Sequence, residues 1–364
     1  MRRETPVTRL AARVFTVPTD QPESDGTISW DSTTLVLAEV EAGGQTGLGY
    51  SYASKACVPV IDDTLRPVVL GLEALDVAKA WEQMWRSVRN LGSRGLAACA
   101  ISAVDVALWD LKAKLLNLSL AELFGRRRDA VMIYGSGGFC SYDEATLRAQ
   151  LGGWVENEGC AAVKMKIGRH PDQDPLRCRH AREAIGEAQL FVDANGAFSV
   201  REALAMIQAL EGLGVTWFEE PVTSDDLPGL SRVRDGAPAK MDVAAGEYGY
   251  DPFYFHRMLD AGAVDVIQAD ATRCLGYSGF LLAAALAEAC NTPLSSHCGP
   301  ALHLPAACAA PRLRHMEWFH DHVRLEAMLF DGVPKPTGGY IRPDLTAPGH
   351  GLVFKAADAA RFAV

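Results

Sequence analysis

The sequence predicts an α/β protein in which a closed parallel β/α barrel follows a smaller α+β domain. Eight short apolar runs typical of strands alternate with helical runs after about residue 130. Polar residues recur where those runs end, one for each strand–helix unit, at intervals of 20 to 28 residues. Parallel strands need helical crossovers, and eight of them close a ring, so the repeat indicates a barrel.

The N-terminal region, residues 1–125, is predicted to form the smaller domain. Thr33–Ala42 is rich in β-branched residues, and a Gly-rich turn and a second hairpin strand are expected after it. Helices are expected over Leu75–Val88 and over Ala97–Leu116, where apolar residues recur at helical spacing. The barrel is expected over residues 126–334, and the Pro- and Gly-rich segment 335–364 is expected to return to the first domain.

The eight predicted barrel strands are short, and each is followed by a polar residue or a turn. They begin at Val131, Ala161, Leu190, Val215, Met241, Val264, Thr292 and His315.

The composition excludes several classes of partner. The chain has 364 residues, 49% hydrophobic and 22% charged, which is typical of a globular protein with a sizeable core. Its net charge of −10 argues against nucleic acid or an anionic membrane as a partner. Nine cysteines without a CxxC pair indicate reduced thiols and a cytoplasmic protein. We find neither a secretory signal nor an apolar run long enough for a membrane span.

Seven chemically active side chains fall at or near the C-terminal ends of successive predicted strands. They are Lys166, Asp193, Glu219, Glu247, Asp270, His297 and Glu317. In a parallel barrel these strand ends converge on one mouth, where catalytic sites lie. One Lys–Glu pair would indicate only a buried salt bridge, but seven ordered positions favour a functional site.

Lys164 and Lys166 share one face of a predicted strand, because residues two apart in a strand point the same way. Burying two ammonium groups is costly unless anions lie near them. Asp193, Glu219 and Glu247 would provide those anions, and three carboxylates without Cys or His suit a hard cation such as Mg²⁺. That cation and Lys164 are expected to lower the pKa of Lys166 and make it a base.

His297 follows Asp270 by one strand unit, so the two side chains are expected to meet. A carboxylate that holds one ring nitrogen of a histidine fixes its tautomer and raises the basicity of the other nitrogen.

The order of these motifs resembles that of the enolase superfamily, mandelate racemase subgroup. The motifs are KMK, VDAN, FEEP, AGE, QAD, SSH and MEW, and SAVDVALWDLKAK resembles the family's capping-domain helix. The resemblance covers nearly the whole chain and implies a modified TIM barrel, (β/α)7β, under an α+β capping domain. It implies Mg²⁺ held by Asp193, Glu219 and Glu247. Muconate cycloisomerases and dipeptide epimerases have a lysine where Asp270 stands, which argues against those subgroups.

The resemblance implies removal of the proton α to a carboxylate, through an enediolate. Mg²⁺ and Lys164 would offset the developing charge, and a protonated Glu317 would donate a hydrogen bond to the substrate carboxylate. Lys166 and the His297–Asp270 pair would flank the substrate on opposite faces. Two opposed groups permit either racemisation or dehydration, in which His297 protonates a departing β-hydroxyl.

The segment Val17–Thr34 has the composition of a mobile loop and is expected to close over the substrate. Its polarity favours a polyhydroxylated acid over an aromatic one. The candidate substrate-binding residues lie in this segment or near the barrel mouth, and they are Asn195, Arg273, Trp30, His320 and Ser136.

We therefore expect a Mg²⁺-dependent acid-sugar dehydratase, a lyase that converts a small carboxylate substrate to a 2-keto-3-deoxy acid. A racemase or epimerase of an α-hydroxy acid is the alternative, and a non-catalytic ligand-binding relative is a remote one. The chain is expected to form a homo-oligomer.

Overall fold

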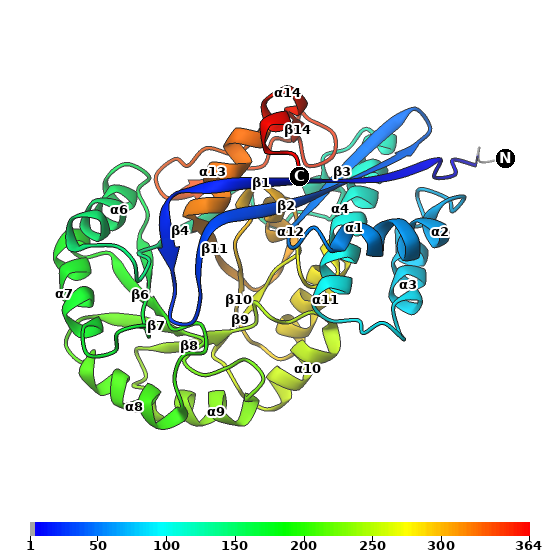
Figure 1. Cartoon of the computed structure of the whole chain (residues 1–364). Coiled ribbons are helices and arrows are strands. Elements are labelled where there is room, and N and C mark those ends of the chain that lie inside the picture. The colour runs from blue at the N-terminus through cyan, green and yellow to red at the C-terminus, as the bar shows by residue number, and fades with distance from the viewer. Residues whose placement is uncertain (1–3) are drawn as a thin grey trace.

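The computed structural model describes residues 4–364 and confirms the parallel barrel. The eight strands follow one another around the ring, and the last pairs with the first to close it (Figure 1). All eight predicted strands are present: β4 (Val131–Gly137), β5 (Ala162–Lys166), β6 (Gln189–Asp193), β7 (Val215–Glu219), β8 (Asp242–Ala245), β9 (Val266–Ala269), β10 (Leu294–Ser296) and β11 (Leu313–Phe319).

Helices cover the outside of the barrel. They are α6 (Glu144–Glu156), α7 (Asp174–Ile185), α8 (Val200–Ala209), α9 (Leu227–Gly236), α10 (Pro252–Asp260), α11 (Gly276–Ala289), α12 (Pro300–Ala309) and α13 (His320–Leu329). Several begin at a side chain that accepts a backbone N–H of the first turn, as Ser199 does at α8 and Asp251 at α10. Outward-facing residues of β5, such as Val163 and Met165, pack under this helical layer.

The interior of the barrel is filled below its mouth. Aromatic and small side chains from alternate positions form this plug, which consists of Tyr134, Ala162, Phe191, Trp217, Ala244 and Val266. Lys164 lies above Tyr134, with its Nζ 5.6 Å from the ring centroid. The barrel is therefore a packed core and not a pore, and His315 also packs against Tyr134, Phe191 and Trp217 within it.

The capping domain combines an antiparallel sheet with helices. The sheet contains β1 (Arg9–Ser24), β2 (Ser29–Ala42) and β3 (Gln45–Tyr52). The helices are α1 (Cys57–Pro59), a π-helical turn (Val60–Leu65), α2 (Arg66–Val69), α3 (Val77–Ser87), α4 (Leu96–Leu116) and α5 (Leu120–Leu123). The two helices predicted from apolar spacing correspond to α3 and α4. None of the helices in residues 4–364 is long and apolar enough to cross a membrane.

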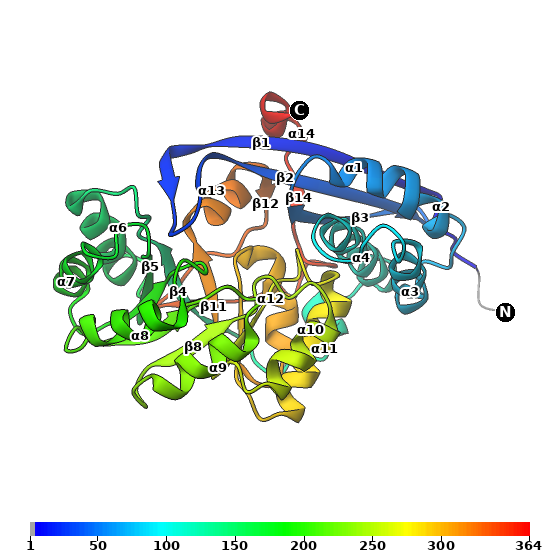
Figure 2. The same ribbon diagram turned by 60° about the horizontal axis from the view of Figure 1, so that its bottom comes forward.

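The segment Val17–Thr34 is not the loop that its composition predicted. It forms the ends of β1 and β2, with a register shift between Pro18 and Glu23, and the turn itself is confined to residues around Asp25–Ile28. Cross-strand pairing outweighs the Pro and Gly content. The hairpin crosses above the barrel, as the views in Figures 1 and 2 show.

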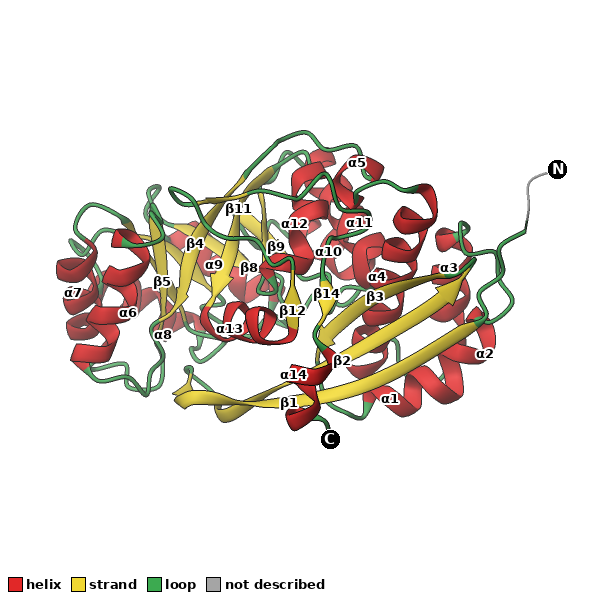
Figure 3. Ribbon diagram, turned by 90° about the horizontal axis from the view of Figure 1, so that it is seen from above, coloured by secondary structure: helices red, strands yellow, loops and turns green. Residues whose placement is uncertain are grey.

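The C-terminal segment touches both parts of the molecule. It contains β12 (Phe330–Asp331), β13 (Tyr340–Ile341), β14 (Val353–Phe354), α14 (Ala356–Ala359) and a 3₁₀ turn (Ala360–Phe362). β13 pairs with β4 of the barrel, whereas the Phe354 ring lies 5.1 Å from that of Phe15 on β1. The last residue donates its N–H to Val14, and α14 lies against β1 in Figure 3.

The capping domain is docked where the loop after β9 runs into α11. Asp105 of α4 accepts hydrogen bonds from the backbone N–H and the hydroxyl of Ser278, at 3.0 and 2.7 Å. Ser102 accepts from the N–H groups of Leu275 and Gly276. The Ser102 bonds are buried and the Asp105 bonds partly buried, so together they hold the cap in one position beside the barrel mouth.

We expect Gly49→Ala to loosen the cap. A Cβ at Gly49 would lie 2.2 Å from the carbonyl oxygen of Ala103 in α4, a backbone atom that cannot move aside. The predicted loss is about 1–3 kcal/mol in the free energy of unfolding, measured by denaturant titration. Gly153→Ala in α6 is the matched control, because its Cβ meets only a side-chain atom at 3.5 Å and should be neutral or stabilising. Equal stability of the two variants would contradict the close sheet–helix contact.

Candidate active site

The polar residues predicted at the strand ends meet in one buried cluster. The β5–β6 and β6–β7 registers place Lys166 beside Asp193 and Asp193 beside Glu219. Eight residues form this cluster, and each is at most 5% exposed: Lys164, Lys166, Asp193, Glu219, Glu247, Asp270, His297 and Glu317. Groups of this kind are rarely buried unless they compensate one another or bind a ligand.

Asp193, Glu219 and Glu247 form a group that fits a hard cation. One oxygen from each lies within 4.8 Å of the others, and Glu247 Oε2 has no hydrogen-bond partner. Gly246 turns the chain at φ 134°, where a Cβ would meet the Gln268 carbonyl oxygen at 2.2 Å. Burial and the neighbouring Asp193 carboxylate raise the pKa of Glu219 to about 8. The three oxygen donors therefore suit Mg²⁺, which would relieve their mutual repulsion.

The two lysines are held by these carboxylates. Lys164 Nζ forms ion pairs with Glu219, with Glu317 at 2.8 Å and with Asp193 at 3.4 Å. Lys166 Nζ lies 2.5 Å from Asp193 Oδ2. Without a cation, burial and Lys164 lower the pKa of Lys166, but the Asp193 carboxylate outweighs them and raises it. A cation that competes for the same carboxylate would lower it, so the expected lowering by a bound cation stays a prediction.

His297 and Asp270 form the expected pair. His297 Nδ1 lies 2.8 Å from Asp270 Oδ2, and the backbone N–H of Thr272 donates to Asp270 Oδ1. Burial alone would raise the pKa of Asp270, but the hydrogen bond with His297 holds it well below its usual range. The other ring nitrogen, Nε2, is 3.3 Å from Glu247 Oε2 and 3.2 Å from Cys298 Sγ.

Glu317 acts as a hydrogen-bond acceptor toward its protein neighbours, and its expected donation to a substrate carboxylate stays a prediction. Its Oε1 accepts from the Ser136 hydroxyl at 2.5 Å and lies 2.8 Å from Lys164 Nζ, while its Oε2 accepts from the Cys298 N–H at 2.8 Å. Burial would raise the pKa of Glu317, but Lys164 outweighs it and holds the pKa below its usual range.

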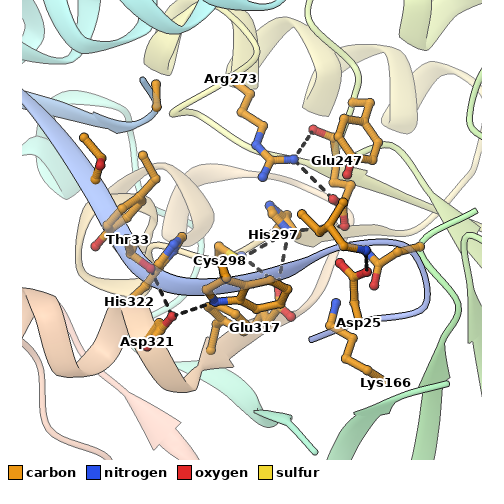
Figure 4. Close-up of a pocket in the computed structure, with 18 of the residues that line it drawn as sticks. Asp25, Thr33, Lys166, Glu247, Arg273, His297, Cys298, Glu317, Asp321 and His322 are labelled. Atoms are coloured by element: carbon orange, nitrogen blue, oxygen red, sulfur yellow. Dashed lines mark hydrogen bonds and ion pairs between the residues drawn. The ribbon is translucent and has the colours of Figure 1, made fainter. Parts of the chain in front are cut away.

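A cavity of about 490 Å³ lies between this cluster and the β1–β2 hairpin (Figure 4). Among the predicted substrate-binding residues, Asn195, Arg273 and Trp30 line it, and Asn195 Oδ1 has no hydrogen-bond partner. Ser136 and His320 do not line it. The Ser136 hydroxyl is buried against Glu317, and His320 Nε2 is bonded to Asp20 at 2.9 Å on the outer side of the hairpin.

Several residues that line the cavity were not among the predicted site residues. Asp321 and His322 lie in the first turn of α13, close after the end of β11, so the search for polar residues near strand ends could have found them. Thr33 and Tyr52 come from the cap, and no sequence signal separates them from other residues of its strands. Residues of the barrel thus form the floor of the cavity, and residues of the cap form much of the side opposite the charged cluster.

Residues 10–125 match the mandelate racemase / muconate lactonizing enzyme N-terminal domain, and residues 146–359 match the enolase C-terminal domain-like family. The chain is 33% identical to a 3,6-anhydro-alpha-L-galactonate cycloisomerase from Streptomyces coelicolor, over 98% of this chain and 99% of that protein. It is 32% identical to an L-talarate/galactarate dehydratase from Salmonella typhimurium, over 82% of this chain and 77% of that protein.

Two solved structures share the whole architecture. A mandelate racemase/muconate lactonizing enzyme-like protein from Rubrobacter xylanophilus superimposes with a TM-score of 0.96 at 46% identity, covering 98% of this chain and 99% of that one. A racemase from Streptomyces coelicolor with bound magnesium gives 0.92 at 32% identity, covering 98% and 100%. With the barrel, the cap and the ordered strand-end residues, these matches show that the chain belongs to the mandelate racemase/muconate lactonizing enzyme family of the enolase superfamily.

Proposed function

We propose that the protein is a Mg²⁺-dependent acid-sugar dehydratase. The main observation behind this proposal is a single cavity. It lies beside three carboxylates that can hold a cation and beside two separate groups, Lys166 and His297, that can accept or donate a proton. Lys166 comes from β5 and His297 follows β10, and these strands are separated by β4 and β11 on one side of the ring and by β6–β9 on the other. The two groups therefore approach a bound substrate from different sides.

Asp193, Glu219 and Glu247 would hold the Mg²⁺, which supplies positive charge to the carboxylate of the substrate. Lys164 lies below the cavity and adds a fixed positive charge beside the carboxylates of Glu219 and Glu317. Loss of the proton α to a carboxylate places a second negative charge on that group, so preorganised positive charge is the largest requirement of the reaction.

The chain's own residues account for the proton movements. Lys166 Nζ or His297 Nε2 takes the proton from C2, and Asp270 stabilises the imidazolium that forms on His297. For dehydration, the C3–O bond breaks, His297 gives a proton to the departing hydroxyl, and water leaves. The enol that remains becomes the 2-keto-3-deoxy acid when it gains a proton at C3.

The polarity of the cavity favours dehydration of a sugar acid over racemisation of an aryl acid. Hydroxyl and amide groups of Ser32, Thr33, Tyr52 and Asn195 line it, and an aromatic substrate would leave them without partners. The cycloisomerase and the dehydratase described above are both named for acid-sugar substrates. Racemisation or epimerisation of an α-hydroxy acid is the second candidate, because the two opposed groups could also return the proton to the other face.

We place the protein in a reducing compartment such as the cytoplasm, because all nine cysteines are free thiols and most are buried. The homo-oligomer expected from the sequence stays a prediction.

Removal of one metal ligand is expected to weaken Mg²⁺ binding. Glu219→Gln should lower the affinity at least about 100-fold in isothermal titration calorimetry, because it removes a charged ligand. Glu220→Gln is the matched control. It makes the same chemical change one residue along the chain, but Glu220 is not one of the three side chains grouped as cation ligands, so the affinity of this variant should match wild type. Equal affinities of wild type and Glu219→Gln would disprove the assignment of the cation site.

The His297–Asp270 pair is tested by Asp270→Asn. We expect kcat to fall about 10²–10⁴-fold, because an amide cannot stabilise the imidazolium. Asp265→Asn makes the same chemical change at the other end of β9, where Asp265 pairs with Arg234 at 2.8 Å, and should leave kcat unchanged. Steady-state kinetics on both variants decide the point. Near wild-type turnover in Asp270→Asn would mean that His297 works without this carboxylate.

The product identifies the reaction. Incubation of a panel of acid sugars with enzyme and Mg²⁺ should yield a 2-keto-3-deoxy acid, detected as its semicarbazone and by NMR. Inversion at C2 with no keto acid, for the best substrate in the panel, would replace the dehydratase proposal by the racemase alternative.

A further inference from the structure

The charges of the cavity differ at its two ends. In Figure 4, Lys166 and Glu247 lie on one side, where the cation site is, and Thr33, Asp321 and His322 lie on the other. The first end takes the reacting carboxylate if the proposed function is correct. The second end, which we call the far wall, consists of Trp30, Thr33, Tyr52, Asp321 and His322 and would face the other end of the substrate.

The cationic groups that line the cavity are already paired at the reacting end. Lys166 is bound to Asp193 at 2.5 Å, and Arg273 Nη1 lies 3.2 Å from Glu247 Oε1. Among residues 4–364, no other lysine or arginine lines the cavity. Arg324 lies behind the far wall, where it donates to the Pro18 carbonyl and to Asp321.

The far wall is acidic. The Asp321 side chain is 1% exposed. Its Oδ2 accepts from the Thr33 hydroxyl at 3.0 Å and from Trp30 Nε1 at 3.4 Å. Burial would raise the pKa of Asp321, but hydrogen bonds with Glu23 and Thr33 hold it below its usual range. Asp321 pairs with Arg324, whose Nη2 lies 3.4 Å from Oδ1, but Arg324 does not line the cavity, so this wall presents a carboxylate and no cation to a substrate.

His322 does not compensate that charge. Its Nδ1 accepts the N–H of Gly299 at 3.2 Å, and its ring stacks on Tyr52 with centroids 3.4 Å apart. Burial lowers the pKa of His322 to about 3, so the ring is neutral and only its Nε2–H remains as a donor.

Glu23 shows what a second carboxylate experiences beside Asp321. Its Oε2 accepts from the same Trp30 Nε1 at 2.8 Å, and it is 1% exposed. Burial and the Asp321 charge raise the pKa of Glu23 to about 9, so it stays protonated at neutral pH. A substrate carboxylate at the far wall would face the same charge and could not remain ionised without a large cost.

The remaining groups of the far wall suit neutral hydroxyls. The hydroxyl of Tyr52 is buried without a partner, and burial raises its pKa, so it stays protonated. Asp321 and the Thr33 hydroxyl can accept hydrogen bonds, and His322 Nε2 can donate one. The indole of Trp30 gives an apolar face on which the C–H face of a sugar can lie.

We propose that the substrate is a monocarboxylic acid sugar, an aldonic acid, and that Asp321 determines this specificity by excluding an aldaric acid with a second carboxylate. The proposal rests on the proposed function, because it assigns the single carboxylate to the cation site. It narrows the substrate class to acids whose far end is an uncharged hydroxyl.

The test uses matched pairs of five- and six-carbon aldonic and aldaric acids with the same configuration at every shared centre. Dissociation constants with Mg²⁺ present are measured by calorimetry, and kcat/KM by formation of the 2-keto acid. We expect wild type to favour the aldonic member of the best pair by about 100-fold or more, because like charges in a buried site strongly oppose binding. Equal or better binding of the aldaric member would overturn the proposal.

Asp321→Asn tests the assigned residue. The ratio of kcat/KM for the aldonic acid to that for the aldaric acid should fall about tenfold or more, chiefly because the variant binds the aldaric acid more tightly. Asp20→Asn is the control, since Asp20 lies on the same hairpin, pairs with His320 and does not line the cavity. Its preference ratio should match wild type. An unchanged ratio in a folded Asp321→Asn would overturn the role of this residue.

The binding measurements show whether the specificity for aldonic acids or the dehydratase function itself is incorrect. Aldonic acids that bind in preference to aldaric acids could still give neither keto acid nor proton exchange at C2. That result would disprove the dehydratase function but would support the exclusion of a second carboxylate. Turnover of the aldaric acids at or above the rate of the matching aldonic acids would disprove only the exclusion of a second carboxylate. Lack of binding by every acid in the panel would overturn both.

Discussion

Compensation of buried charge is the constraint on which the rest of the structure depends. Two ammonium groups lie in one dry volume with four carboxylates, those of Asp193, Glu219, Glu247 and Glu317. The carboxylates oppose one another, and burial together with Asp193 raises the pKa of Glu219 to about 8. A divalent cation would relieve this repulsion, and the parallel register of β6, β7 and β8 keeps its three ligands together.

The barrel and the cap contribute different parts of the site: the barrel provides the groups that transfer protons, and the cap provides residues that select the substrate. The barrel supplies the charged cluster and the His297–Asp270 pair, whereas the cap supplies Trp30, Thr33 and Tyr52 to the opposite side of the cavity. Hydrogen bonds from α4 to the N-terminal end of α11 and the residue before it fix the cap beside the barrel mouth. Changes in the hairpin can therefore alter which acid fits without disturbing the proton-transfer groups.

Local patterns in the sequence were sufficient to predict the barrel and its strand-end residues, because alternation within a strand and one polar residue per unit follow from backbone geometry. They failed where the outcome depends on distant contacts. The ion pair of Lys164 with Glu317 joins β5 to β11, and no local pattern shows it. The hairpin is ordered by pairing that its composition does not show, and Thr33 meets Asp321 across 288 residues of sequence.

The central claim is that the buried cluster uses a divalent cation to labilise the proton α to a carboxylate. The most direct measurement is NMR-detected exchange of the C2 proton of an acid-sugar substrate in D₂O, while Mg²⁺ is titrated into metal-free protein. The account predicts no exchange without Mg²⁺ and exchange that saturates with one ion bound per chain. Exchange or turnover at full rate in the presence of excess chelator would contradict it.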